Sequence, residues 1–83
     1  MARKLDRTSS LILSATAKTP MTPGQIARFY RIPVVECWRR VRELQETGLL
    51  RLIMVNATAD GRTLRFFQST IASEHLVDVP LTR

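Results

Sequence analysis

The chain has few residues of several types, and each shortage excludes a class of protein. Its single cysteine, Cys37, cannot form an internal disulfide, and we expect it to be a small buried hydrophobe rather than a reactive thiol. One cysteine and one histidine, His75, offer no set of ligands for a metal, so we predict no metal site. No apolar run approaches the roughly 18 residues of a membrane span, and no signal-peptide segment follows the basic start. These absences favour the reducing cytoplasm.

The sequence also lacks the marks of an enzyme. It has no glycine-rich phosphate loop, no nucleophile with an evident base and no acidic pair in an apolar setting. Its 83 residues suffice for one modest core and leave little room for a catalytic pocket. We therefore predict a single domain, residues 1–83, that is not an enzyme and uses no cofactor.

Acidic residues are the scarcer of the two charge types. Seven Asp and Glu oppose thirteen Lys and Arg, which gives a formal net charge of +6. Twelve of the bases and five of the acids precede Phe66, so residues 1–65 carry +7 and the remainder carries −1. Such basic charge usually indicates a polyanionic partner, and the alternative is a solvated basic surface.

Residues 22–50 contain the strongest structural pattern. Thr22 can cap a helix, Pro23 suits the first helical position, and Gln25 completes a capping box. Pro33 stops this helix and can open the next one. Two helices joined by so short a turn are typical of a helix-turn-helix.

The second of these helices is expected at about residues 34–47. Cys37, Val41 and Leu44 fall within a sector of about 60° and should face the core. Gly48 suits the left-handed position that ends a helix. The other face carries Val35, Glu36, Arg39, Arg42, Glu43 and Glu46, with Trp38 and Arg40 on its flanks.

A helix is also expected before this motif, beginning at about residues 6–9 and running to about Lys18. Its core-facing residues should be Leu11, Ile12 and Ala15. Leu13 points elsewhere in this phase, which makes it either an ordinary exposed leucine or part of a subunit contact.

After Gly48 the period changes from 3.6 to 2, which predicts a strand over about 51–55. Residues 56–62 form a polar break in which Asp60-Gly61 suits a hairpin turn, and residues 63–68 return as a second strand. The hairpin must pack on the helices, through Leu64 and Phe66 on one side or Phe67 on the other. The predicted fold class is mainly α with a small β-hairpin.

The sequence pattern of residues 69–83 fits more than one secondary structure. Val77 and Val79 alternate around Asp78, which favours a short strand, and a helix remains an alternative. The low charge of this segment suits dimerisation, by strand pairing or by packing on the first helix of another subunit. The predicted dimerisation residues are Leu13, Val77 and Val79.

The order of these elements resembles a winged helix-turn-helix domain, and more specifically the small prokaryotic, notably archaeal, regulators of the ArsR-like group. The matching segments are Thr22-Pro-Gly-Gln-Ile-Ala27, Ile32-Pro33, Cys37-Trp-Arg-Arg-Val-Arg-Glu-Leu44, Gly48-Leu-Leu50, Asp60-Gly-Arg62 and Phe67-Gln-Ser69. The resemblance implies three helices, a wing and a short C-terminal strand, with the helix-turn-helix at about 22–48, the wing at about 50–68 and a dimerisation segment at about 69–83. It also implies a homodimeric, nucleoid-associated transcriptional regulator that binds double-stranded DNA.

Two positions depart from the family pattern. Arg31 stands where the family often has glycine in the turn, and a left-handed arginine would cost about 1 kcal/mol or more. Either the turn differs, or Arg31 is retained for its charge. Val35 and Glu36 stand where small hydroxyl residues commonly meet DNA.

For a DNA-binding protein, chemistry assigns the exposed residues to two groups. The predicted base contacts are Val35 to a thymine methyl, Glu36 to cytosine N4 and Arg39 to guanine. The alternative for Arg39 is an ion pair with Glu43. The predicted phosphate contacts are Arg28, Arg31, Arg40, Arg42 and Arg62, of which Arg62 could instead enter a minor groove or stay solvated.

The alternative function is a winged-helix protein-interaction module inside a larger transcription or replication complex. In that case an apolar and acidic face would dock a partner protein, and binding to DNA would be weak and nonspecific. This face would consist of Val34, Val35, Glu36 and Trp38.

Overall fold

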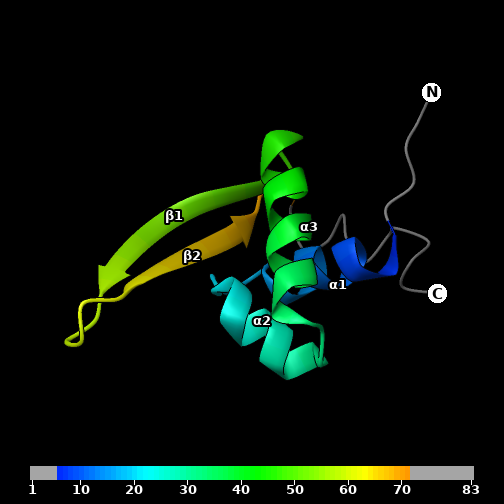
Figure 1. The fold of residues 1–83 in the computed structure, drawn as a ribbon. Coiled ribbons are helices and arrows are strands. Elements are labelled where there is room, and N and C mark those ends of the chain that lie inside the picture. The colour runs from blue at the N-terminus through cyan, green and yellow to red at the C-terminus, as the bar shows by residue number, and fades with distance from the viewer. Residues whose placement is uncertain (1–5, 72–83) are drawn as a thin grey trace.

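We analysed a computed structural model, which describes residues 6–71. Its elements follow in the order α1 (Arg7–Ala15), α2 (Pro23–Tyr30), α3 (Val34–Glu46), β1 (Leu50–Ala57) and β2 (Thr63–Ser69). The helices gather around α3, and the two strands form a long hairpin that projects away from them (Figure 1). The predicted fold class of three helices and a β-hairpin is confirmed. The predicted C-terminal strand, with Val77 and Val79, lies outside the described residues.

Helix α1 begins where Asp6 caps it and ends earlier than the sequence suggests. The Ser9 amide donates to Asp6 Oδ1 at 2.7 Å, so the helix begins within the predicted range of residues 6–9. The helix stops at Ala15 instead of about Lys18. Thr16 explains the difference, because its amide and its hydroxyl both bond to the Ile12 carbonyl while its own carbonyl accepts from Ser69 in the hairpin.

The burial of Leu13 shows that the predicted inward face of α1 was too narrow. It is fully buried with Ile12 in the core, whereas Leu11 and Ala15 are only half-buried. Helix α1 contacts α2, α3 and β2, so a wider sector of it is covered than a single stripe. The prediction that Leu13 lies outside the core is wrong, and its side chain is not available for a subunit contact in this structure.

Helix α2 has both halves of the predicted capping box. The Gln25 amide donates to Thr22 Oγ1 and the Thr22 amide donates to Gln25 Oε1, each at 3.0 Å. Arg31 ends the helix in the left-handed conformation, with φ 57° and ψ 45°. Its amide and that of Ile32 both donate to the Ala27 carbonyl. The turn therefore keeps the shape that favours glycine, although arginine occupies it.

Helix α3 buries the three residues predicted to face the core, Cys37, Val41 and Leu44. Burial raises the pKa of the Cys37 thiol, as expected of an unreactive core cysteine. The helix ends at Glu46, and Gly48 just beyond it takes the predicted left-handed conformation, with φ 84°. The Gly48 amide donates to Gln45 and the Leu49 amide to Leu44, which satisfies the last carbonyls of the helix.

The hairpin docks on the helices through Phe67. This side chain is 2% exposed and belongs to the core, whereas Leu64 is 37% exposed and Phe66 is half-buried. Of the two predicted docking faces, the structure therefore has the one with Phe67. Residue Met21, in the loop before α2, exchanges two backbone hydrogen bonds with Phe67, of 3.0 and 2.8 Å. This bridge fixes the base of the hairpin against the helices.

Candidate nucleic-acid interface

A cleft of about 370 Å³ lies between α3 and the hairpin. Its lining residues are Trp38, Val41, Arg42, Gln45, Leu52, Arg65 and Phe67. The first four lie on one face of α3, and the others come from the two strands. The cleft is therefore a direct consequence of the docking of the hairpin beside this helix.

An aromatic contact forms the floor of the cleft. Trp38 packs edge-to-face on Phe67, with ring centroids 6.4 Å apart and planes at 89°. Because Phe67 is held in the core, this contact fixes the angle between α3 and β2. Trp38 remains partly exposed, so one side of its ring faces the cleft.

Two arginines from different elements line this cleft. Arg42 comes from α3, and Arg65 comes from β2, where it shares a face with Phe67 two residues later. Neither makes an ion pair with any residue of the 6–71 range. Two guanidinium groups over a partly apolar floor make a site suited to an anionic group such as a phosphate.

Arg65 was not among the predicted site residues. Arg62 was chosen instead, because it lies at the predicted turn. The signal for Arg65 was present in the period of two, since a docked Phe67 places Arg65 on the helix-facing side of the strand. The position of Arg65 therefore follows only from the docking of Phe67 rather than Phe66.

Glu36 is paired with two arginines. Arg39 Nη2 donates to Glu36 Oε1 at 2.6 Å, and Arg40 Nε donates to Glu36 Oε2 at 2.9 Å. The hydrogen bond from Arg39 is the main reason that the pKa of Glu36 lies below its usual value. The predicted alternative pair of Arg39 with Glu43 is not formed, and Glu43 accepts from Arg40 instead.

Arg40 is surrounded by three carboxylates. Besides Glu36 and Glu43, it contacts Asp6 Oδ2 at 2.8 Å, which joins α3 to the N-terminus of α1. Hydrogen bonding to Glu43 is the largest cause of its raised pKa. Arg40 was predicted to bind phosphate, but here its guanidinium has an intramolecular role.

Helix α3 is electrically balanced. Its three arginines are opposed by Glu36, Glu43 and Glu46. The basic excess of the described residues therefore lies elsewhere, chiefly on α2, the turn and the hairpin. The arginines of these three segments are Arg28, Arg31, Arg51, Arg62 and Arg65.

The other predicted contacts occupy exposed positions. Val35 is 77% exposed near the start of α3, and Arg39 projects from the same helix. Arg62 lies at the hairpin tip, 3.6 Å from Asp60 and otherwise open to solvent. Their positions allow contact with a ligand, and the contacts themselves stay predictions.

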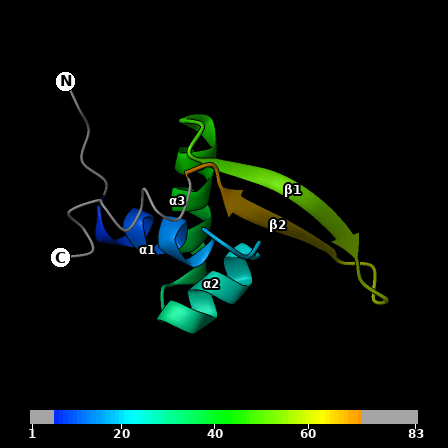
Figure 2. The same cartoon turned by 180° about the vertical axis from the view of Figure 1, so that it is seen from behind.

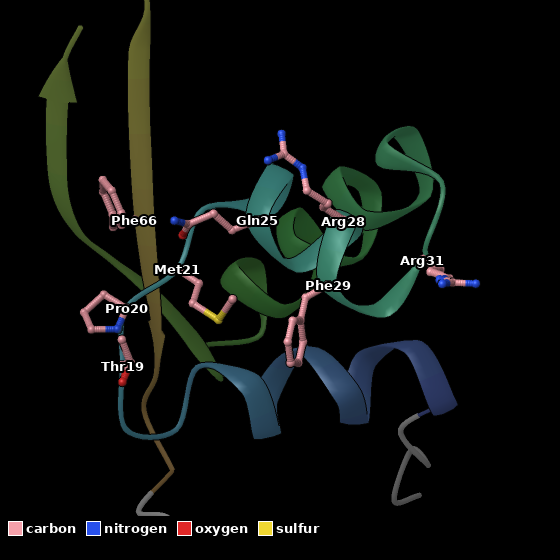
Figure 3. Close-up of a pocket in the computed structure, with 8 residues that line it drawn as sticks. All are labelled: Thr19, Pro20, Met21, Gln25, Arg28, Phe29, Arg31 and Phe66. Carbon is pink, nitrogen blue, oxygen red and sulfur yellow. The ribbon is translucent and has the colours of Figure 1, made fainter.

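A second, more open hollow of about 620 Å³ lies between α2 and the other face of the hairpin (Figure 3). Phe29 and Phe66 give it apolar walls, and Arg28 lies at its rim. Figure 3 shows Arg28 and Arg31 pointing in different directions, with Arg31 directed away from the hairpin. Both predicted phosphate contacts thus line the hollow, although their side chains diverge.

Within residues 6–71 no three potential metal-ligating side chains come together. No described helix is long and apolar enough to cross a membrane.

The arrangement of α2, α3 and the hairpin defines the fold as a winged helix-turn-helix. No protein-family model and no curated protein matches the chain. Solved structures of ZitR from Lactococcus lactis do match. A mutant of ZitR is 20% identical at a TM-score of 0.72, over 94% of this chain and 52% of that one.

Two further matches are complexes. A ZitR mutant in complex with DNA is 25% identical at a TM-score of 0.69, over 90% of this chain and 49% of that one. Wild-type ZitR in complex with DNA is 26% identical at a TM-score of 0.65, over 94% of this chain and 49% of that one. The present chain spans about half the length of these ZitR chains.

Proposed function

We propose that the protein is a transcriptional regulator that binds double-stranded DNA. The observation that carries this proposal is the cleft between α3 and the hairpin, with Arg42 and Arg65 on its opposite walls. A fold shared with ZitR, which has been solved in complex with DNA, supports it. The ArsR-like subtype, the homodimeric state, the cytoplasmic nucleoid location and the absence of catalysis and of a cofactor are further parts of the proposal.

In the proposed complex, α3 enters the major groove and the sugar-phosphate backbone lies along the cleft. Arg42 and Arg65 then bind phosphate from two sides and position the helix without reading sequence. Arg28, Arg31 and Arg62 provide further phosphate contacts, and Arg62 at the hairpin tip is the one that can reach a minor groove. Release of counterions by these arginines supplies most of the affinity.

Base recognition falls to the outer face of α3. Val35 can contact a thymine methyl, and Arg39 can bind guanine O6 and N7 after it leaves Glu36. Glu36 Oε1 then becomes free to accept from cytosine N4, while Oε2 stays paired with Arg40. Sequence specificity is thus coupled to the opening of one exposed ion pair, which costs little because such pairs are weak.

The cleft is tested by the affinity of three variants for a mixed-sequence duplex, measured by fluorescence anisotropy over a range of salt concentrations. Arg42→Gln and Arg65→Gln should each weaken binding and lower the salt slope by about 1. The control, Arg7→Gln, removes the same charge from α1 and should change the slope little. If all three variants behave alike, the phosphate does not lie in the cleft.

The role of Glu36 can be predicted separately. Glu36→Gln gives α3 a net charge of +1 and releases Arg39, so affinity for mixed-sequence DNA should rise several-fold. Glu46→Gln adds the same charge without touching an ion pair of the described residues, and its smaller effect serves as the reference. Equal gains from both variants would show that the Glu36 pair does not restrain Arg39.

The second candidate, a protein-interaction module, is favoured by the exposure of apolar residues at the α2–α3 turn. Phe29, Val34 and Val35 are all largely exposed. The acid of the predicted docking face, Glu36, is however occupied by two arginines. Absence of duplex binding at low salt would favour this candidate.

A further inference from the structure

Four consecutive large apolar residues of β1 are exposed to solvent. This apolar run consists of Leu52, Ile53, Met54 and Val55, whose exposed fractions range from 36% to 52%. Strands that face water on one side usually alternate polar and apolar residues, and exposed runs of this length are uncommon unless they bind something. The run therefore requires an explanation that the core does not provide.

Both faces of the strand contribute to the run. Leu52 lies opposite Phe67 on the side of α3, whereas Met54 lies opposite Phe66 on the other side. The register shifts between Leu52 and Met54, so Ile53 is the extra residue of a β-bulge. Packing on the helices could cover only one of these faces, and it reaches only the base of the hairpin.

The outer edge of β1 is also unpaired. In the part of the chain that the structure describes, the sheet contains only β1 and β2, and the bridge to Met21 is made by β2. Figure 2 shows β1 along the outer side of the hairpin, with α2 on the side of β2. The edge thus offers free amide and carbonyl groups next to apolar side chains, which is the usual template for an added strand.

We propose that β1 pairs with β1 of a second copy of the chain, antiparallel across a twofold axis between Ile53 and Met54. This pairing would join the two hairpins into a four-stranded sheet. It rests on the homodimer of the proposed function and assigns its interface to β1.

The sequence of β1 is complementary to itself in this register. Leu52 lies opposite Val55, and Ile53 lies opposite Met54, so apolar residues meet throughout the centre. The only charged residue of the strand, Arg51, lies opposite the uncharged Asn56 instead of a second arginine. A twofold interface demands such self-complementarity, and this is why a second copy is the occupant that we propose.

The pairing is compatible with the cleft beside α3. A strand added at the edge extends the sheet sideways and leaves the face that carries Arg65 open. A monomeric variant should therefore retain binding to DNA through its own cleft, with lower affinity.

The first test is the mass in solution by light scattering at about 100 μM. The wild type should be a dimer, and Ile53→Lys should be a monomer because it buries a charge at the interface. Thr63→Lys places the same charge on β2 and should remain dimeric. A cooperative thermal transition in each would show that all three proteins are folded. A monomeric wild type, or a dimeric Ile53→Lys, would overturn the proposal.

The second test is disulfide formation, which reports the register. Leu52→Cys and Val55→Cys should cross-link efficiently when mixed and poorly when each is alone, because the two positions oppose each other only across the axis. The buried Cys37 can remain in both variants. Equal cross-linking in all three samples would refute this register. The measurements do not depend on DNA, so a failure of the proposed function would be seen separately.

Discussion

Arg31 occupies the left-handed conformation at the turn between α2 and α3, where a side chain normally costs about 1 kcal/mol. It is the one non-glycine residue between positions 6 and 71 with a positive φ. Of the two explanations open from the sequence, a changed turn is not observed. Retention for its charge is the explanation that agrees with the proposed role in binding phosphate.

Arg31→Gly should therefore increase the free energy of unfolding by about 1 kcal/mol while it weakens binding to DNA. Urea denaturation measures the first effect, and anisotropy measures the second. Arg31→Ala removes the charge but keeps the strained conformation, so it should weaken binding equally without the gain in stability. Full DNA affinity in both variants would show that the charge of Arg31 is not used.

The ion pairs of α3 show what sequence spacing leaves open at the residue scale. Arg39 could reach Glu43 one turn later or Glu36 one turn earlier, and both spacings are favourable in a helix. In the structure Arg39 pairs with Glu36, while Arg40 pairs with Glu36 and Glu43 and also contacts Asp6, the cap of α1. That tertiary contact is not visible in the local pattern.

At the scale of elements, the contact between Asp6 and Arg40 ties α1 to α3. The Ser9 amide is the main cause that lowers the pKa of Asp6 below its ordinary 3.8, and the charge of Arg40 adds to it. A carboxyl group with a depressed pKa in the folded state contributes stability above its unfolded pKa. This contribution disappears as the pH falls through the folded value.

The wild type should consequently lose stability as the pH drops below 3.8, and Asp6→Asn should lose less over the same range. Asparagine keeps the helix cap but not the charge, so the two proteins differ mainly in the titrating group. Thermal unfolding followed by circular dichroism between pH 2 and 6 measures the difference, with pH values chosen to span about two units on each side of 3.8. Parallel curves would mean that Asp6 is not perturbed by folding.

The hairpin is stabilised mainly at its base. Phe67→Ala should lower the free energy of unfolding by about 3–5 kcal/mol, since it empties a buried site that also supports Trp38. Leu64→Ala, on the exposed part of β2, should cost less than about 1 kcal/mol. Urea denaturation compares them, and Phe67→Leu replaces Phe67→Ala if the latter does not fold. Similar costs at positions 64 and 67 would contradict the docking through Phe67.

Elements with a local cause were predictable from the sequence. The capping box of α2, the left-handed Gly48 and the hairpin turn at Gly61 each depend on a few neighbouring residues. The burial of Leu13 and the stop at Thr16 were not predictable, because α1 is covered by α2, α3 and β2 and the Thr16 carbonyl accepts from Ser69 in the hairpin. Predicting the cleft would have required the relative placement of α3 and β2. The sequence indicated only the wall that α3 provides.

The whole molecule places its basic charge around α3 rather than on it. The helix itself is neutral, while the turn and the hairpin carry arginines on both sides of it. This distribution supports an account in which the surrounding elements hold the DNA backbone and α3 is left to contact bases. It also explains how the count of charges indicates a polyanionic partner although the three arginines of α3 are balanced by three acids.

The most direct test of this account is the affinity of the wild-type protein for a mixed-sequence duplex, measured by fluorescence anisotropy as a function of salt concentration. Five proposed phosphate contacts, Arg28, Arg31, Arg42, Arg62 and Arg65, predict that the logarithm of the association constant falls with the logarithm of salt with a slope of about −4 to −5 per copy. Absence of binding at low salt, or a slope near zero, would contradict the proposal that the protein binds DNA through these arginines.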